Sequence, residues 1–271
     1  MKNYFGDLTN YYEYLDQNNI FDLLEIDKTK VDKDQLNRNI IPDPYLSVDP
    51  HNKVPFPPEL DDLCRLHYLV KKRKATTILE FGIGMSTYVF DDALRSNDKE
   101  FGVYVRENLR RSNPFELHSI DNYQEWIDSV KSNAKNPLSD KATLHCCPLK
   151  IGTFNDRMCT YYENLPNISP DFIYLDGPDQ FSPEGSIRGL NTAHPDRMPM
   201  AADLLTIEHF LIPGTLIVVD GRTANARFLK SNFQRDWTYS YFPELDQHFF
   251  ELDEEPLGPY NKLYLEFASS S

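Results

Sequence analysis

The segment from Thr77 to Thr87 constrains the fold of this chain more than any other stretch. It reads Thr-Ile-Leu-Glu-Phe-Gly-Ile-Gly-Met-Ser-Thr: a β-prone apolar run, a carboxylate (Glu80), two glycines (Gly82 and Gly84) and the start of a helical pattern. A buried strand that turns through glycines into a helix can cradle a ligand, because glycine lets the ligand approach the backbone and the helix start offers free N–H groups. The third glycine of a dinucleotide fingerprint is absent, since Ser86 and Thr87 occupy that region. Taken alone, the segment is either a cradle or a simple strand–helix turn, and the features that follow it decide between these.

Further strands are predicted downstream, several of which also end in acids. They cover residues 115–121, 142–147, 171–176 and 215–220, with acids at Asp121, Asp176 and Asp220. Helical patterns are predicted over 59–70, 86–109 with a polar break at 96–98, 122–130, 201–211 and from 224 onward. The tail looks strand-rich at 237–242, 249–252 and 262–267. We therefore predict a doubly wound α/β fold: a mostly parallel seven-stranded sheet with an antiparallel C-terminal edge and helices on both faces.

Two regions are predicted from composition and proline content. Residues 1–56 form an N-terminal extension or lid, with extended segments at 40–44 and 54–58, and residues 57–271 form the main Rossmann-like domain. The loop from Asp179 to Pro199 is too long for a connector and is predicted to form, with the N-terminal segment, a lid that defines the acceptor pocket.

Charge and cysteine content restrict the partners. The chain has 42 acidic and 28 basic residues, a formal net charge of −14, so we expect neither nucleic acid nor membrane as a partner. The four cysteines lack Cys-x-x-Cys spacing and are expected to be buried free thiols. With no apolar signal core and no membrane span in the sequence, we expect a cytoplasmic protein. Its oligomeric state is not predicted.

The order of these motifs resembles the class I S-adenosylmethionine-dependent methyltransferases, from about residue 57 to residue 267. The resemblance lies in residues 80–87, 118–121, 171–177 and 211–220. It implies that the glycine turn lies against the methionine part of S-adenosylmethionine, that the acid ending the second strand holds the ribose hydroxyls, and that residues after the third strand flank the adenine. The implied cofactor residues are Glu80, Gly82, Gly84, Ser86, Thr87, Asp121, Asn122, Cys147 and Pro148. Glu80 could instead cap the adjacent helix.

Metal dependence stays open at this point. Metal-dependent O-methyltransferases resemble this chain in having acids at the positions of Asp176 and Asp220, but their usual third ligand is replaced by Gly221. Such a pair could hold Mg²⁺ only with water or substrate completing the octahedron.

The acceptor-side residues each have two interpretations. Asp176 is either an active-site acid or a turn residue, and His194 is either a general base or a solvated loop histidine. Arg197 is expected to contact substrate, and Arg222 either binds an anionic acceptor or pairs with Asp176 or Asp220. Asn225 either caps a helix or touches substrate. Together with Asp220, these residues form the predicted catalytic and substrate-binding set.

The expected function is methyl transfer from S-adenosylmethionine to a small polar acceptor, with O-methylation of a sugar or glycan favoured. The alternatives are N-methylation, a non-catalytic nucleotide-binding or scaffold protein, and an NAD(P)-dependent oxidoreductase. An acidic rim suits a sulfonium cation better than a pyrophosphate, which favours the methyltransferase.

Overall fold

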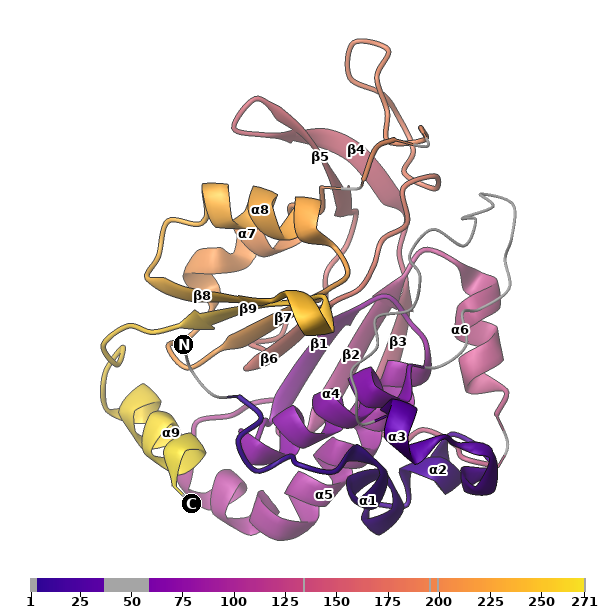
Figure 1. Ribbon diagram of the computed structural model, residues 1–271. Helices are drawn as coiled ribbons and strands as arrows, with labels where there is room; N and C mark the ends of the chain where they lie inside the picture. The colour runs from indigo at the N-terminus through magenta and orange to yellow at the C-terminus, as the bar shows by residue number, and fades with distance from the viewer. Residues whose placement is uncertain (1–3, 37–58, 134, 195, 199, 271) are drawn as a thin grey trace.

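The computed structural model describes residues 4–36, 59–133, 135–194, 196–198 and 200–270. Within them a seven-stranded sheet has the order β3-β2-β1-β6-β7-β9-β8 (Figure 1). Its strands are β1 (Thr77–Phe81), β2 (Glu116–Asp121), β3 (Ala142–Cys146), β6 (Phe172–Leu175), β7 (Leu216–Asp220), β8 (Trp237–Phe242) and β9 (Gln247–Leu252). The segments predicted to be extended at 40–44 and 54–58, and the boundary at residue 56, lie outside the described part of the chain.

The predicted fold class is confirmed. Strands β3, β2, β1, β6 and β7 pair in parallel, whereas β9 runs antiparallel to both of its neighbours, β7 and β8. The reversed strand is therefore β9, and it lies one place in from the C-terminal edge. This order, with one reversed strand next to the edge, agrees with the class I methyltransferase fold that the sequence resembles.

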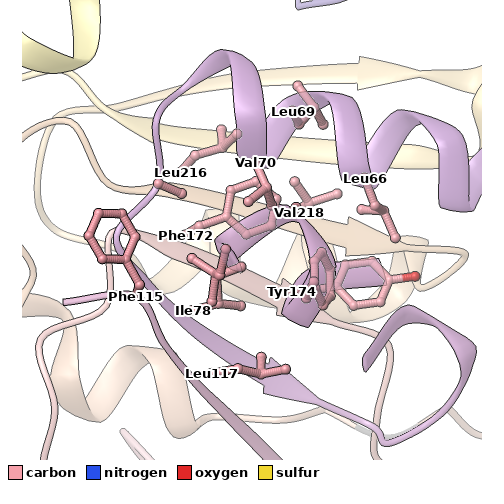
Figure 2. Close-up of a cluster of buried hydrophobic side chains, with 14 of the residues drawn as sticks. Leu66, Leu69, Val70, Ile78, Phe115, Leu117, Phe172, Tyr174, Leu216 and Val218 are labelled. Carbon is pink, nitrogen blue, oxygen red and sulfur yellow. The ribbon is translucent and has the colours of Figure 1, made fainter. Parts of the chain in front are cut away.

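Helices cover both faces of the sheet (Figure 1). Those of the main domain are α4 (Leu60–Lys72), α5 (Met85–Asn108), α6 (Gln124–Lys131), α7 (Asp203–Ile207), α8 (Thr223–Asn232) and α9 (Pro259–Ser269). Figure 2 shows Leu66, Leu69 and Val70 of α4 lying over sheet residues that include Ile78 and Phe172. Helices α7 and α8 pack on the opposite face through Leu204, Ala226 and Leu229. The alternation of strand side chains between the two faces fixes which ones meet α4 and which meet α8.

The N-terminal extension packs against the main domain. It contains α1 (Tyr11–Gln17), α2 (Ile20–Leu23), α3 (Lys33–Leu36) and a short 3₁₀ turn, Lys28–Lys30. Leu15 and Phe21 share an apolar cluster with Cys64 of α4 and Val89 of α5. The hydroxyl of Tyr14 lies 2.8 Å from Nδ1 of His67, so His67 is a packed core residue on α4.

Several expectations about local structure were wrong. Residues 262–267 belong to helix α9, because Pro259 sets the first turn and Asn261, Tyr264 and Phe267 bury one face at three-residue spacing. The expected break at 96–98 is absent, since Asn97 is buried inside α5 and donates to the carbonyls of Val70 and Ala75.

A further difference is an antiparallel hairpin that the sequence did not predict. It is formed by β4 (Leu149–Phe154) and β5 (Arg157–Tyr162) and stands between β3 and β6 in the chain.

The 201–211 helix is shorter than expected and ends in a 3₁₀ turn, Glu208–Phe210. All four thiols are free, but Cys146 is exposed rather than buried.

Candidate active site

A cavity of about 430 Å³ opens where β1, β2, β6 and β7 end. Carboxyl ends of parallel strands are where open α/β sheets bind ligands. The sequence-predicted residues that line it are Gly82, Gly84, Ser86, Asp121, Asn122, Asp176, Asp220 and Arg222. The sheet thus brings together residues that lie up to 140 positions apart in the chain.

The two glycines of the turn have different physical roles. Gly82 has a φ of +101°, and a Cβ there would lie 2.9 Å from the backbone nitrogen of Gly177. Gly84 has an extended backbone, and a Cβ there would meet nothing within 4 Å. Gly82 is therefore required by the close approach of two strand ends, whereas Gly84 leaves open space at the start of α5 where a ligand can approach the backbone.

Asp121 is held in position by main-chain donors. Its Oδ2 accepts from the Ile83 N–H at 3.0 Å and its Oδ1 accepts from the Tyr123 N–H at 2.9 Å. Burial raises the pKa of this carboxyl, and the backbone N–H donors oppose that rise. Each oxygen retains acceptor capacity, so a diol in the cavity could donate a hydrogen bond to each oxygen.

Glu80 and Thr87 do not line the cavity. Glu80 is fully buried and accepts hydrogen bonds from Ser86 at 2.5 Å, Thr87 at 2.8 Å and Ser119 at 2.5 Å. Burial raises its pKa to about 7, although the three hydroxyl donors lower it. The structure therefore favours the helix-capping interpretation: Glu80 ties the end of β1 to the first turn of α5. Ser86 borders the cavity, but its hydroxyl donates its hydrogen to Glu80.

Two aromatic side chains line the cavity that were not singled out in the sequence. Tyr123 and Trp126 both follow Asp121 closely and both are partly buried. They offer flat apolar surface beside a carboxylate that can hold a diol. Their position in the sequence could have predicted this, since a residue just beyond a strand's carboxyl end lies at the ligand-binding edge of the sheet.

The far wall of the cavity is acidic. Asp176 and Asp220 line it as predicted, and Asp62 and Glu59, from α4 and its N-cap, join them. Burial is the main cause of a raised pKa at Asp62, Asp176 and Asp220, and repulsion between the carboxylates adds to it; the pKa of Asp220 reaches about 6. The Asp176 side chain is about half exposed (53%) because the cavity is open, so water moderates its shift.

Among the described residues that line the cavity, Arg222 is the one basic side chain. Its Nη1 donates to the Pro178 carbonyl at 2.6 Å and its Nη2 donates to the Asp176 carbonyl. Its Nε lies 3.8 Å from Asp176 Oδ1. Of its two predicted roles, the structure favours pairing with Asp176.

Other predicted residues lie away from this cavity. Cys147 and Pro148 do not line it; Cys147 packs with the β4–β5 hairpin, which occupies the region after β3. Asn225 is buried, and both polar atoms of its side-chain amide bond to the Ala201 backbone. Its Oδ1 accepts from the Ala201 N–H at 3.0 Å, and its Nδ2 donates to the Ala201 carbonyl at 3.2 Å. It anchors the end of the long loop to α8 and does not line the cavity.

The long loop places its basic residues outside the cavity lining. His194 is exposed, and its Nδ1 accepts from the Asp196 N–H at 3.2 Å. Arg197 donates to the Asn191 carbonyl at 2.8 Å. Glu184 bonds to Leu149 and Ile151 through the backbone, so this part of the loop extends the hairpin. The predicted catalytic role of His194 and substrate role of Arg197 therefore have no support from their positions.

Two further observations bear on the site. Among the described residues no group of three or more His, Cys, Asp or Glu side chains could hold a metal ion, and we assign no metal ligands. A larger cavity, about 680 Å³, opens at the opposite end of β1 beside Arg110 and Tyr260. Its lining contains no carboxylate and none of the predicted site residues, so we place the candidate active site at the carboxyl edge.

The fold and the cavity define a Rossmann-like domain with a site suited to a nucleoside ligand. No family model matches the chain, and no curated protein matches it. Among solved structures, the chain is similar to the SAH-bound methyltransferase PaMTH1 of Podospora anserina (13% identity, 73% of this chain and 80% of that chain, TM-score 0.43).

Two O-methyltransferases are also similar in fold. One is from Bacillus cereus in complex with SAH (14% identity, 90% of each chain, TM-score 0.40). The other is TomG of Streptomyces achromogenes, involved in tomaymycin synthesis, in complex with SAM (12% identity, 92% of this chain and 94% of that chain, TM-score 0.37). These values are too low to assign the chain to a family, so the function must be inferred from the site. In the part of the chain that the structure describes, no helix has both the length and the apolar character needed to span a bilayer.

Proposed function

We propose that this protein is an S-adenosylmethionine-dependent methyltransferase. The observation that supports this most strongly is the charge of the cavity at the glycine turn. Among the described residues, six acidic side chains line it (Glu59, Asp62, Asp121, Asp176, Asp179 and Asp220) against one guanidinium, which is bound to backbone carbonyls. This negative lining favours a sulfonium cation and disfavours the pyrophosphate of a dinucleotide.

The residues of the cavity fit the parts of such a cofactor. Asp121 would accept from the ribose diol, Tyr123 and Trp126 would contact the adenine, and the open space at Gly84 would take the methionine portion. When bound, S-adenosylmethionine supplies an electrophilic methyl group. The chain's own contribution is to align donor and acceptor and to accept the proton that the acceptor loses.

The acceptor we propose is a small polar molecule methylated on oxygen, such as a sugar or a glycan residue. A neutral hydroxyl needs a base to become a good nucleophile, and Asp176 and Asp220 lie on the wall of the same cavity. N-methylation is the second candidate, because the acidic wall would also attract a protonated amine. We expect no nucleic acid acceptor, given the net charge of −14.

The N-terminal extension would support the acidic wall. Its helices pack on α4, the helix that carries Asp62 and is preceded by Glu59. The described part of this extension, residues 4–36, therefore acts, in this proposal, as a brace for the acceptor side of the cavity.

Two experiments test the function. Titration calorimetry should show binding of S-adenosylmethionine and of its demethylated product, SAH, with no binding of NAD⁺ or NADH. Incubation with methyl-labelled cofactor and separate pools of saccharides, small alcohols and amines should then transfer label to one pool. Binding of NADH instead of SAH would contradict the proposal. Binding of SAH with no transfer to any pool would favour the non-catalytic nucleotide-binding alternative.

A further inference from the structure

One hydroxyl stands between two carboxylates on the acidic wall, Asp62, which is buried, and Asp220, which is partly buried. The Tyr174 hydroxyl lies 3.2 Å from Asp220 Oδ2 and 3.4 Å from Asp62 Oδ2. A phenol has one hydrogen to donate, so it can satisfy only one of the two carboxylates at a time. If both carboxylates were ionised, one would be left in a buried place without this donor, beside a like charge.

The sheet and α4 fix this arrangement. Tyr174 pairs in register with Val218 on β7, which places its side chain on the same face as Asp220, two residues further along β7. That face is covered by α4, which carries Asp62. Gln247 pairs in register with Asp220 and donates its Nε2 hydrogen to Asp62 Oδ1, which leaves Oδ2 facing Tyr174.

The two carboxylates have different surroundings. Asp62 is 5% exposed, whereas Asp220 is less deeply buried at the cavity wall. Arg65 is the nearby cation, but its closest carboxylate is Asp61 at 2.8 Å, while Asp62 is 3.6 Å away. Among the described residues, the other charged groups near the cluster are the acids Glu59, Asp176 and Asp246 and the cation Arg222, which pairs with Asp176. The charged form is therefore most strongly disfavoured at Asp62.

We propose that Asp62 holds a proton and donates it to the Tyr174 oxygen, that Tyr174 donates its own hydrogen to Asp220, and that Asp220 is thereby kept as the ionised base facing the acceptor. Asp62 and Tyr174 are positioning residues in this scheme, because they act through Asp220. In this series of hydrogen bonds, from Asp62 to Tyr174 to Asp220, each donated hydrogen has one acceptor. Burial raises the pKa of both carboxyls, and Asp62 is the more deeply buried of the two, which agrees with this order.

The proton balance of the proposed reaction is compatible with this series of hydrogen bonds. As the acceptor oxygen forms its bond to the methyl carbon, the C–S bond breaks and the acceptor's proton passes to Asp220. One positive charge on sulfur and one negative charge on the carboxylate disappear together, so the net charge of the cavity does not change. Only this last step rests on the proposed function; the hydrogen-bonded chain is a property of the free protein.

The test is a ¹³C NMR pH titration of the whole chain labelled at the aspartate Cγ, with the Asp62 and Asp220 signals assigned from Asp62→Asn and Asp220→Asn. In the wild-type protein the Asp62 signal should be that of a protonated carboxyl at pH 7, and Asp220 that of a carboxylate. Tyr174→Phe removes the hydroxyl and keeps the ring, so the Asp220 titration should move up by about one pH unit. Asp62→Asn keeps an N–H donor toward Tyr174 and should leave that titration in place.

Tyr239→Phe is the matched control, because the Tyr239 hydroxyl is also partly buried but bonds to His248. It should not move the Asp220 titration. An ionised Asp62 at pH 7 in the wild-type spectrum would overturn the inference, as would an unchanged Asp220 titration in Tyr174→Phe. Once an acceptor is found, Tyr174→Phe should shift the acidic limb of the kcat profile with little change in the KM for cofactor. Failure of the protein to bind SAH would refute the proposed function while leaving the titration result standing.

Discussion

Gly82 and Gly177 touch backbone to backbone where β1 and β6 end. A Cβ on Gly177 would lie 2.8 Å from the Gly82 nitrogen, and the reverse distance is 2.9 Å. Gly177 also donates its N–H to the Phe81 carbonyl at 2.6 Å. The floor of the cavity is thus a contact that only two glycines can make.

Alanine at Gly82 and at Gly84 should therefore act differently. Gly82→Ala meets main-chain atoms that cannot move aside and a φ of +101°, so it should lower the free energy of unfolding by roughly 2 kcal/mol or more. Gly84→Ala should change stability by less than about 1 kcal/mol but weaken SAH binding, since the methyl group enters open cavity space. Urea unfolding and calorimetry measure the two effects. Equal stability losses in the two variants would contradict this assignment.

Asp121→Ala should weaken SAH binding by at least about tenfold, or about 1.4 kcal/mol, because the ribose would lose its acceptor. The variant also leaves the N–H groups of Ile83 and Tyr123 unpaired, so its stability should fall by about 1–3 kcal/mol. Asp98→Ala is the control, since Asp98 pairs with Arg106 and Lys141 on the surface of α5. Calorimetry below the unfolding temperature of each variant separates affinity from stability.

Glu80→Gln should remove a pH dependence of stability. The folded protein holds the Glu80 proton up to about pH 7, whereas the ordinary pKa is 4.5, so the unfolded chain loses that proton first as pH rises. The free energy of unfolding should therefore fall as pH rises from about 4.5 to 7, by roughly 3 kcal/mol at most. Glutamine cannot ionise, so urea unfolding of Glu80→Gln between pH 5 and pH 8 should lack this slope. Parallel pH curves for wild type and variant would count against the raised pKa.

Trp126 should report cofactor binding by fluorescence. The chain has two tryptophans, and only Trp126 lines the cavity. Trp237 lies at the other edge of the sheet, stacked on Phe233 and bonded to Glu208 at 3.0 Å. SAH should change the emission of the wild type and of Trp237→Phe, but not that of Trp126→Phe. A signal that persists in Trp126→Phe would place the ligand elsewhere.

Asn225→Ala should destabilise the protein without altering acceptor affinity. The substitution removes both hydrogen bonds to Ala201 and leaves buried main-chain groups unpaired, which costs about 1–3 kcal/mol. Amide hydrogen exchange at Ala201 should accelerate, and the acceptor KM should stay within about twofold. A large rise in that KM would restore the substrate role expected from the sequence.

The sequence predicted the parallel sheet because its strands are apolar runs that end in acids or glycine, a local pattern with a regular meaning. It also placed Gly84, Asp121, Asp176 and Asp220 at the ligand edge, since strand ends converge there in any such sheet. It could not find Asp62, because an acid on a helix that begins before β1 gives no sign that it faces the cavity until α4 is packed. For His194 and Asn225, residue chemistry suggested a role, while their hydrogen-bond partners are set by the course of a loop that has no periodic pattern.

The reversed strand β9 makes the acidic wall the last part of the site to be completed as the chain is synthesised. Asp62, Tyr174 and Asp220 all precede Gln247, which arrives only when β9 pairs beside β7. Until then β7 has an unpaired edge and Asp62 lacks its amide donor. Asp121, by contrast, is held by the N–H groups of Ile83 and Tyr123, so the two sides of the cavity depend on different stretches of the chain.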